Sequence, residues 1–509
     1  MTLENKKIKN LIELKTILKN KDFALCHGTF DIVHPGHLRQ FIYAKKYTKI
    51  LVVSLTGDEF ILKGNLKPYV NENLRALNLS VINLVDYVLI DNNLEPISLI
   101  KKIKPKFFIK GYEYKNLTNE KTVKEKNTVE KYGGKIIFSP GDYIYSSTKI
   151  ITDQKPNLKY EKLYTLLDKE KLSIDEIIKI TKEFSRKKVI IIGDTIVDRY
   201  SNAGVVGGMH KSPTLSVQIL NSQDYIGGAA IVAMHLKALG ADVTFCSIIG
   251  DDKEGNFVRQ TLKKNKINTN LIVLKNRNTS LKNNIICQNH KILKIDRVDN
   301  DIIGKDTLFD LFKFNIKKFD TIILSDFRHG IFNSDNIKLV NNFLNKKVYK
   351  VADTQVASRW GNLLDFKNFD LLTPNEREIR FALADQDTVL RPLGKKLMDK
   401  IKCKNLFIKL GNQGVMSIRD YNKYKKPSFH LDSFVDSSEV LDPVGAGDAF
   451  LAYSALGMTV SGNDLASCIL GTIAAGESCR YIGNKPVGLE KVNERLLALN
   501  AIIKNINIF

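Results

Sequence analysis

Short, continuously apolar runs recur along the first part of the chain, and turn residues bound each one. The runs are Phe23–Cys26, Ile50–Ser54, Val85–Ile90, Phe107–Ile109 and Ile136–Phe138. Runs of this length predict strands that are buried on both faces. Residues 8–20 carry apolar residues at helical spacing, as a covering helix would. We therefore expect a parallel α/β sheet whose ligands bind at the carboxyl ends of the strands.

The later part of the chain repeats this alternation. Buried strands are predicted at 189–192, 243–249, 322–325, 348–352 and 406–410. Residues 201–225 contain Leu215-Ser216-Val217-Gln218-Ile219, whose apolar and polar positions alternate. This alternation is typical of a β-strand. A second α/β unit follows from these patterns.

A change in pattern separates the two parts. The segment 153–157, with Pro156, breaks the first alternation, and Ser173 then looks like the N-cap of a helix. A length of 509 residues suits about two or three domains. We expect domains at 1–153 and 187–509, joined by a helical linker at 154–186.

Composition favours a cytoplasmic globular protein. Hydrophobic residues make up 43% of the chain, and no apolar run approaches the roughly 20 residues of a membrane span. The N-terminus shows no signal-peptide pattern. The six cysteines are scattered singly, which argues against a zinc site or a disulfide framework. We expect no membrane partner.

The formal net charge of +23 raises the question of a nucleic-acid or acidic-lipid partner. Lysine is spread evenly, however, and no long basic block occurs. A positive field would also attract phosphorylated small substrates. We therefore expect no nucleic-acid binding.

A glycine-rich turn near the C-terminal end carries the clearest chemistry. Leu441-Asp442-Pro443-Val444-Gly445-Ala446-Gly447-Asp448-Ala449-Phe450 leads from a polar turn into an apolar helix. Gly445, Ala446 and Gly447 let backbone N–H groups approach an anion at the helix N-terminus. Asp448 places a carboxylate base beside them, as phosphoryl transfer to a hydroxyl requires. Alternatively, Asp448 is only an acidic residue in a first helical turn.

A histidine pair follows the first predicted strand. In His27-Gly28-Thr29-Phe30-Asp31-Ile32-Val33-His34-Pro35-Gly36-His37, Pro35 suits a first helical turn. His34 and His37 then lie one turn apart, where two imidazoles and free amides can hold a triphosphate. A metal pair and ordinary surface histidines are the alternatives.

This stretch resembles the HxGH nucleotidyltransferases, which include cytidylyltransferases and adenylyltransferases. The similarity continues through Lys110-Gly111-Tyr112 and Tyr145-Ser146-Ser147-Thr148-Lys149. The resemblance implies a Rossmann-like domain in which His34 and His37 are catalytic. It implies attack of a sugar or polyol phosphate on a nucleotide α-phosphate, with Mg²⁺ and release of pyrophosphate. The implied nucleotide-binding residues are Gly28, Thr29, Phe30, Lys110, Ser146, Ser147 and Thr148.

The Asp442–Phe450 run resembles the C-terminal motif of PfkB/ribokinase sugar kinases. The resemblance implies a ribokinase-like α/β domain with a β-lid over 201–225, often used for dimerisation. Asp448 would be the base, and Gly445, Ala446 and Gly447 would hold the transferring phosphoryl. The implied sugar-binding residues are Asp194, Asp198, Gly227, Gly228 and Asp326. The implied nucleotide-binding residues are Asn375, Glu378, Lys409, Gly411 and Gly414, with Glu378 holding Mg²⁺ through water.

Both halves together resemble bifunctional heptose 7-phosphate kinase/heptose 1-phosphate adenylyltransferases. The similar stretches are GDTIVDRY at 193–200, SP at 212–213, GGAAIVAMHLKALGA at 227–241, LSDFRHG at 324–330 and KGYEYK at 110–115. In that family the kinase comes first, whereas here it comes second. Three pocket positions also depart from the family: Ile231 replaces an Asn, and His329 and Gln355 each replace a Lys.

These patterns predict a bifunctional enzyme that makes a nucleotide-activated sugar for a surface glycan. Its substrates would be ATP and sugar phosphates, with CTP as an alternative for the N-terminal domain. One alternative is a cytidylyltransferase fused to a kinase for another sugar or polyol. Another alternative, prompted by Ile231, is a kinase half retained as a non-catalytic scaffold. The lid makes a homodimer an open possibility.

Overall fold

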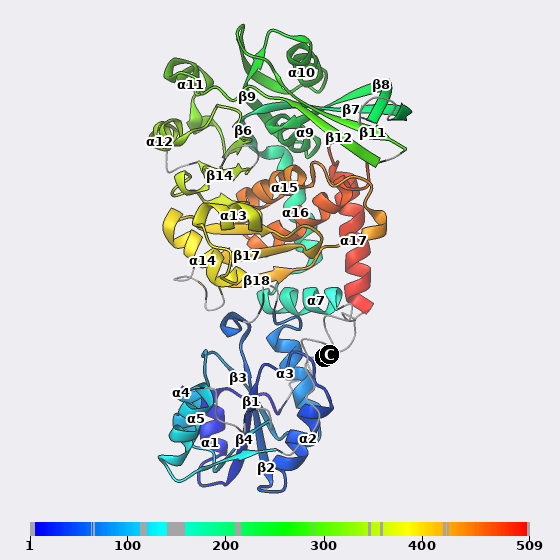
Figure 1. Cartoon of the computed structure of the whole chain (residues 1–509). Coiled ribbons are helices and arrows are strands. Elements are labelled where there is room, and N and C mark those ends of the chain that lie inside the picture. The colour runs from blue at the N-terminus through cyan, green and yellow to red at the C-terminus, as the bar shows by residue number, and fades with distance from the viewer. Residues whose placement is uncertain are drawn as a thin grey trace. The chain divides into compact units, whose positions relative to one another are not determined.

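The computed structural model describes residues 6–62, 64, 67–111, 114, 120–139, 158–208, 215–288, 290–344, 348–356, 360–420, 424 and 427–505. Its chain forms two compact units, Met1–Glu170 with Ile503–Phe509, and Lys171–Ile502. Figure 1 shows the first in blue to cyan and the second in cyan to red. The predicted linker is divided between them, because α7 (Lys159–Glu170) belongs to the first unit and α8 (Ile174–Lys182) to the second.

The first unit contains the parallel sheet that the apolar runs predict. Its strand order is β3-β2-β1-β4-β5, and every pairing is parallel. The strands are β1 (Phe23–Gly28), β2 (Ile50–Thr56), β3 (Tyr87–Asp91), β4 (Phe107–Lys110) and β5 (Lys135–Phe138). The order reverses between β1 and β4, so a ligand site is expected at the carboxyl ends of these two strands.

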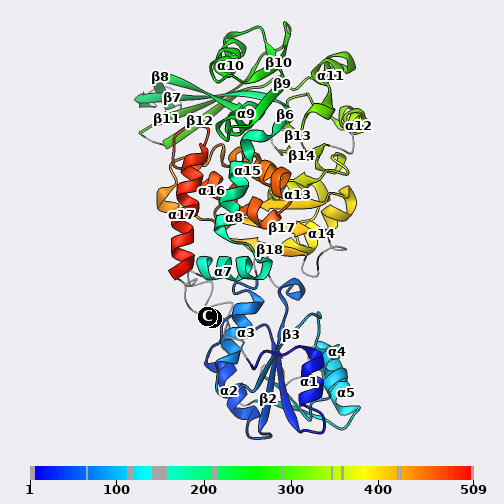
Figure 2. The same ribbon diagram turned by 180° about the vertical axis from the view of Figure 1, so that it is seen from behind.

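Helices cover both faces of this sheet, as Figures 1 and 2 show. Along β1, Ala24 and Cys26 belong to one apolar cluster, whereas Phe23 and Leu25 belong to the other. This alternation explains why the run is apolar at every position. The first cluster packs under α2 (Pro35–Ala44) and α3 (Glu72–Ser80), and the second under α1 (Leu11–Ile17), α4 (Ile97–Ile103) and α5 (Glu120–Glu130).

A buried arginine holds the carboxyl edge of the sheet. Arg75, on α3, is fully buried. Its guanidinium donates to the carbonyls of Thr29 and Thr56, the latter at 2.8 Å, and pairs with Asp58 at 2.7 Å. Thr29 follows β1 and Thr56 ends β2, so one side chain fixes both loops. The turn that leads to the histidine pair is therefore braced from the core.

The second unit is built on a nine-stranded sheet. Its order is β10-β9-β6-β13-β14-β15-β16-β17-β18, with β17 and β18 antiparallel at one edge. The strands are β6 (Lys188–Gly193), β9 (Asp242–Gly250), β10 (Asn268–Leu274), β13 (Thr321–Asp326), β14 (Tyr349–Thr354), β15 (Leu371–Leu372), β16 (Asn405–Lys409), β17 (Val415–Arg419) and β18 (Ser428–Leu431). The remaining seven strands pair in parallel, as the predicted α/β unit requires.

The small sheet has more strands than residues 201–225 predict. Its order is β12-β11-β7-β8, with β7 (Thr195–Gly208), β8 (Leu215–Gly228), β11 (Ser280–Cys287) and β12 (His290–Arg297). The pairing of β11 with β7 is parallel and joins segments that are distant in sequence. Local patterns do not reveal such pairing, so β11 and β12 escape the sequence analysis. We call this four-stranded sheet the lid.

Two helices place the glycine-rich turn. α15 (Ala446–Ser461) and α9 (Ala229–Ala238) contact each other and are almost wholly buried. The other helices of the unit are α10 (Lys253–Lys264), α11 (Lys305–Leu311), α12 (Ser334–Phe343), α13 (Glu376–Leu383), α14 (Leu390–Ile401), α16 (Asp464–Ser478) and α17 (Leu489–Asn505). Trp360, the single tryptophan of the chain, is exposed and packs against Phe381. Within the described ranges, no helix combines the length and apolarity that crossing a bilayer requires.

Candidate active sites

The glycine-rich turn forms the start of α15. Gly445 is the N-cap, with φ of 84°, a left-handed conformation that glycine adopts without strain. The Ala446 amide donates to the Pro443 carbonyl at 3.3 Å, and the Asp448 amide to the Gly445 carbonyl at 3.1 Å. In the described part of the chain, no backbone carbonyl accepts from the amides of Gly445 and Gly447. These two amides, rather than all three, are available for an anion.

Asp448 lies in the first turn of α15 and is 8% exposed. Burial raises the pKa of its carboxyl group to about 8, and the charge of Asp353 adds to the effect. The charge of Lys409 lowers the pKa of Asp448, and Lys409 itself pairs with Asp353 at 2.8 Å. A carboxyl group with a pKa near neutrality is suited to take a proton from a hydroxyl. Asp448 therefore has both the position and the proton affinity of a base.

Asn375 and Glu378 hold each other at the start of α13. The backbone amide of Asn375 donates to Glu378 Oε2 at 2.7 Å, and the backbone amide of Glu378 donates to Asn375 Oδ1 at 2.8 Å. Together these bonds form a capping box. Burial raises the pKa of Glu378 to about 7. Asn375 also bridges to Lys409 on β16. The structure thus brings Asn375, Glu378 and Lys409 together beside Asp353.

A cavity of about 270 Å³ opens beside the start of α15. Three predicted nucleotide-binding residues, Lys409, Gly411 and Gly414, line it together with Ala446 and Gly447. Further lining residues, absent from the sequence prediction, are Asn412, Ser433, Val435, Ser437, Val440, Pro443, Phe450, Thr472, Ala475, Gly476 and Cys479. The hydroxyl oxygen of Thr472 is buried here without a hydrogen-bond partner among the described residues. A largely apolar cavity with a few polar groups beside an anion site is what a nucleotide requires.

Asp198, a predicted sugar-binding residue, lies within electrostatic reach of Asp448, because its charge helps to raise the pKa of that carboxyl group. It is buried on β7, and burial raises its pKa to about 6. Asn484 donates to its Oδ2 at 2.6 Å. A Cβ atom at Gly227 would overlap the same carboxylate, and one at Gly445 would overlap Asn484 Oδ1. Asn484 therefore connects Asp198 with the glycine-rich turn, a contact that its loop position does not reveal.

Asp194 and Asp326 are buried, and each accepts hydrogen bonds from the protein, although Asp194 Oδ1 has no partner among the described residues. Asp194 Oδ2 accepts from the amides of Phe327 and His329 at 2.8 and 3.2 Å. Asp326 accepts from the Arg328 amide and from the Thr354 hydroxyl, both at 2.8 Å. Burial raises the pKa of Asp326 to about 7. Both carboxylates hold the loop after β13 through its backbone amides. Gly228 packs against the backbone carbonyl of Asp194, which a Cβ atom at this position would overlap.

The three departures from the family pattern lie in ordered positions. Ile231 is buried among the apolar residues of α9. His329 is buried, and burial lowers the pKa of its ring to about 3, so the ring is neutral. The backbone amide of Gln355 donates to the backbone carbonyl of Asp326 at 2.9 Å. None of the three supplies a cation to the sugar side of the site.

The contact at Gly445 gives a prediction with a matched control. Gly445→Ala places a Cβ against Asn484 and also strains a left-handed residue. Gly462 at the other end of α15 has the same conformation, with φ of 63°, but no atom within 4 Å of its Cβ position. Gly462→Ala should lower the free energy of unfolding of the second unit by about 1 kcal/mol and leave the activity of that unit intact. Gly445→Ala should lower ADP release at least about tenfold.

Denaturant unfolding and ADP release of both variants check this expectation. Equal activity of the two variants would contradict this expectation. It would show that the Asn484 side chain moves away from the new Cβ atom without loss of activity.

The first unit places the histidine pair at the start of α2. Pro35 is the first helical residue, and His34 is the N-cap. The rings of His34 and His37 stack with centroids 3.8 Å apart, and Phe30 meets His37 edge-on at 4.9 Å. Burial, with a contribution from His34, lowers the pKa of His37 to about 3. Two imidazoles, of which the His37 ring is neutral, thus lie at a helix N-terminus that follows β1.

Lys110 ends β4, beside the end of β1, and pairs with Glu125. Its ammonium also lies 4.4 Å from the Tyr114 ring centroid. Gly28 ends β1. Lys110 and the histidine pair therefore share the carboxyl edge where the strand order reverses. The predicted residues Ser146, Ser147 and Thr148 lie outside the described residues, as do Tyr112 and the Ser212-Pro213 pair.

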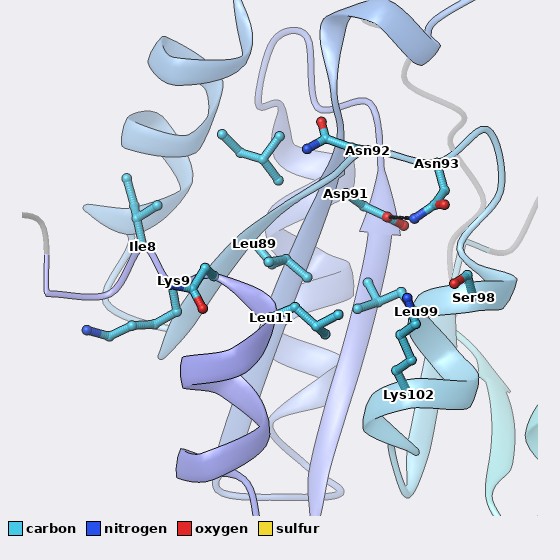
Figure 3. A pocket seen from close by; sticks show the side chains of 12 residues that line it. Ile8, Lys9, Leu11, Leu89, Asp91, Asn92, Asn93, Ser98, Leu99 and Lys102 are labelled. Atoms are coloured by element: carbon cyan, nitrogen blue, oxygen red, sulfur yellow. Dashed lines mark hydrogen bonds between the residues drawn. The ribbon is translucent and has the colours of Figure 1, made fainter. Parts of the chain in front are cut away.

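A second cavity, of about 450 Å³, lies at the carboxyl end of β3 (Figure 3). Its apolar side is formed by Leu11, Leu89 and Leu99, and Asp91 and Asn93 hydrogen-bond to each other at 2.6 Å on its polar side. No residue predicted for nucleotide binding lines this cavity. It is distinct from the site at β1 and β4.

Comparison with known proteins finds a family match in each part of the chain. Residues 186–488 match the model of the pfkB family of carbohydrate kinases, and residues 25–153 match a cytidylyltransferase-like family. A protein of Aliarcobacter butzleri named Bifunctional protein HldE is 30% identical over 320 residues, 61% of this chain and 64% of the relative. Its namesake in Campylobacter jejuni strain RM1221 is 29% identical over 325 residues, 63% of this chain and 67% of the relative. The chain thus spans about two thirds of the length of the curated relatives that it matches.

The fold of the second unit is also similar to a solved structure. Phosphofructokinase-2 from Escherichia coli, in complex with substrates and products, aligns with a TM-score of 0.51 at 14% identity. The alignment covers 62% of this chain and 99% of that one. At this identity the likeness concerns the fold alone. Since the kinase family model covers more than half of the residues, this chain belongs to the pfkB family of carbohydrate kinases, with a cytidylyltransferase-like domain preceding the kinase domain.

Proposed function

We propose that the chain is a bifunctional enzyme that makes a nucleotide-activated sugar. The second unit phosphorylates a sugar or sugar phosphate with ATP, and the first joins a nucleotide to a sugar 1-phosphate with release of pyrophosphate. The observation that carries the kinase half is the buried Asp448 carboxylate beside the open amides of Gly445 and Gly447.

Each residue of the kinase site has a definite task. Asp448 takes the proton of the acceptor hydroxyl, which then attacks the γ-phosphorus as ADP leaves. The amides of Gly445 and Gly447 stabilise the charge on the transferring group. Asp198 accepts hydrogen bonds from sugar hydroxyls and is held by Asn484. The cavity between Gly411, Gly414 and α15 holds the nucleotide base.

Mg²⁺ is part of this proposal. Oxygen ligands suit this ion, which keeps several of its waters in protein sites. Asp353 and Glu378 supply carboxylates beside Lys409, and both already accept hydrogen bonds from the protein. This arrangement fits an ion that Glu378 would hold through water. The ion would offset the charge of the triphosphate.

In the first unit, His34 and His37 hold the triphosphate at the N-terminus of α2. The attacking phosphate oxygen forms a bond to the nucleotide α-phosphorus as pyrophosphate leaves. Imidazole N–H groups of this pair donate to the phosphate oxygens and stabilise the charge that builds up. Lys110 lies at the same edge of the sheet and would exchange Glu125 for phosphate oxygens. Ser146, Ser147 and Thr148 complete this site in the proposal.

For the substrate we propose heptose 7-phosphate for the kinase and heptose 1-phosphate with ATP for the transferase. The relatives named Bifunctional protein HldE support this choice. Their matches extend over 320 and 325 residues, close to the length of the kinase unit. A chain with its two domains in reversed order would give matches of this extent.

A second candidate takes CTP and a different sugar or polyol phosphate. The description of the first domain as cytidylyltransferase-like favours CTP. Ile231, neutral His329 and Gln355 favour an altered sugar pocket, because each removes a polar or cationic partner of the family's sugar.

The test is a direct assay of the purified chain. Mg-ATP and Mg-CTP are each combined with heptose 7-phosphate, heptose 1-phosphate and other sugar phosphates, and ADP and pyrophosphate release are measured. Both products with heptose phosphates and ATP support the proposal. Release of pyrophosphate only with CTP, or release of ADP only with sugars other than heptose phosphates, would favour the second candidate. No ADP release with any sugar would mean that the kinase half is a scaffold.

We place the functional domains at 1–153 and 187–509, with 154–186 as the connection. The family matches at 25–153 and 186–488 support these bounds. The six cysteines are all free and buried, which suits a reducing compartment such as the cytoplasm.

We further propose that two chains associate through the lid. Its strands expose several large apolar residues: Val205, Val206, Leu215, Ile219, Leu220, Leu293 and Ile295. Exposed apolar patches of this kind mark protein contacts. Leu220→Glu should shift a dimer toward monomer in sedimentation equilibrium, whereas Leu62→Glu, at an exposed position in the first unit, should not. A wild-type chain that sediments as a monomer contradicts this proposal.

A further inference from the structure

One lysine on the lid forms no ion pair or hydrogen bond among the described residues. Lys282 lies on β11 and is half-buried. Within the described ranges, its ammonium group makes no hydrogen bond or ion pair, and it lies 5.7 Å from the Phe327 ring centroid. A partly desolvated cation without a partner is costly, unless a ligand supplies the partner.

The strand register places Lys282 between two carboxylates. In the strand register, Lys282 lies opposite Asp198 on β7 and opposite Asp296 on β12. The three side chains therefore lie in one row on one face of the lid. Each carboxylate has another partner. Asp198 accepts from Asn484 at 2.6 Å, and Asp296 meets Lys294 at 3.4 Å. Lys282 is therefore surrounded by charge but left available.

This face of the lid is turned toward the phosphate turn. Tyr200, two residues beyond Asp198 on the same face, donates to Asp442 at 2.5 Å, and Asp442 precedes Gly445 in the turn. The charge of Lys282 also lowers the pKa of the buried Asp448 carboxyl group, against the stronger effect of desolvation. Lys282 thus lies within electrostatic reach of both the sugar carboxylate and the base.

Other cations around the sugar side are occupied by the protein. Arg277 donates to the carbonyls of Asp299 and Asp301, and Arg328 to that of Phe332. Lys291 pairs with Asp442 at 2.9 Å. His329, which stands where the family has a lysine, is neutral. An anionic group on the sugar would find Lys282 free and these groups engaged.

From this geometry we infer that Lys282 binds a phosphate ester on the acceptor sugar and selects phosphorylated over unphosphorylated sugars. The inference rests on the proposed kinase function and deepens it. It names a residue that takes the place of the two basic groups missing at His329 and Gln355. An ammonium group gives a phosphate a charge-assisted hydrogen bond, which a neutral sugar hydroxyl does not match.

The test compares one sugar phosphate with its unphosphorylated form as acceptors, using the full chain and Mg-ATP. Lys282→Gln should raise KM for the phosphorylated sugar about tenfold to a hundredfold and change KM for the free sugar less than about twofold. Lys282→Arg should keep most of the preference. Lys294→Gln is the matched control, since Lys294 lies on the same sheet, is half exposed and already contacts Asp296.

Three outcomes separate this inference from the function beneath it. Equal losses for both sugars would overturn it, because Lys282 would then serve a hydroxyl or the lid itself. Unchanged values for both sugars would overturn it as well. If the wild-type chain releases no ADP with any sugar, the kinase proposal fails by itself. Titration calorimetry of the sugar phosphate against wild type and Lys282→Gln then still decides whether Lys282 binds the phosphate.

Discussion

Replacing Asp448 by Asn is expected to lower kcat for ADP release about a thousandfold and to leave pyrophosphate release unchanged. The amide cannot take the proton of the acceptor hydroxyl, although it has nearly the same shape. The amides of Gly445 and Gly447 remain, so residual phosphoryl transfer above the uncatalysed rate is expected. Parallel assays of ADP and pyrophosphate with the same preparation measure both effects.

The pKa of Asp448 adds a pH signature to this prediction. The carboxylate must be ionised to act as a base, so kcat/KM for ADP release should rise with pH and level off above about 8. Folding raises this pKa above its value in the unfolded chain. At pH values between the two, the folded state binds a proton that the unfolded state does not. Stability is therefore lost as pH rises through this window. The Asn variant should be at least as stable as wild type at neutral pH, and a variant that unfolds more easily would weaken the assignment.

Replacing His37 by Ala is expected to lower pyrophosphate release about a hundredfold and to leave ADP release intact. The ring stacks on His34 at 3.8 Å and meets Phe30 at 4.9 Å, so its removal takes away a donor and also loosens its neighbour. For this reason the losses from His34→Ala and His37→Ala should not add in the double variant. Initial rates for the two single variants and the double variant measure this coupling.

The kinase reaction is the internal control for the histidine variants, because it belongs to the other unit. His37→Gln keeps a hydrogen-bond donor and should fall between wild type and His37→Ala. Loss of both products in His37→Ala would point to misfolding rather than to nucleotide binding. Full pyrophosphate release would remove the histidine pair from the mechanism.

The sequence predicts much of the framework because its signals are local. The runs at Phe23 and Ile50 are apolar at every position, and the structure covers both faces of these strands. The identity of Gly445 follows from its left-handed conformation, and Pro35 marks the start of α2 as expected. Such features depend on neighbouring residues and can be read without tertiary contacts.

Roles that depend on distant contacts escape the sequence. Asn484 holds Asp198 across 286 positions of sequence, and nothing in its own loop indicates this. Lys282 gains its place from parallel pairing between β7 and β11. Asp194 and Asp326 follow strands, as sugar-binding carboxylates would, and each has an oxygen that accepts from the protein's own amides, whereas Asp194 Oδ1 has no partner among the described residues. A position at a strand end predicts proximity to the site but not the direction of the carboxylate.

The division into two units also decides what a stability measurement on this chain can mean. Each unit has its own sheet and its own apolar core, so the chain has no single melting temperature and no single free energy of unfolding. Trp360 is the only tryptophan, and it lies in the kinase unit. Indole fluorescence therefore follows the kinase unit alone, whereas circular dichroism follows both. A difference between these two signals separates damage to one unit from damage to the other within the same molecule.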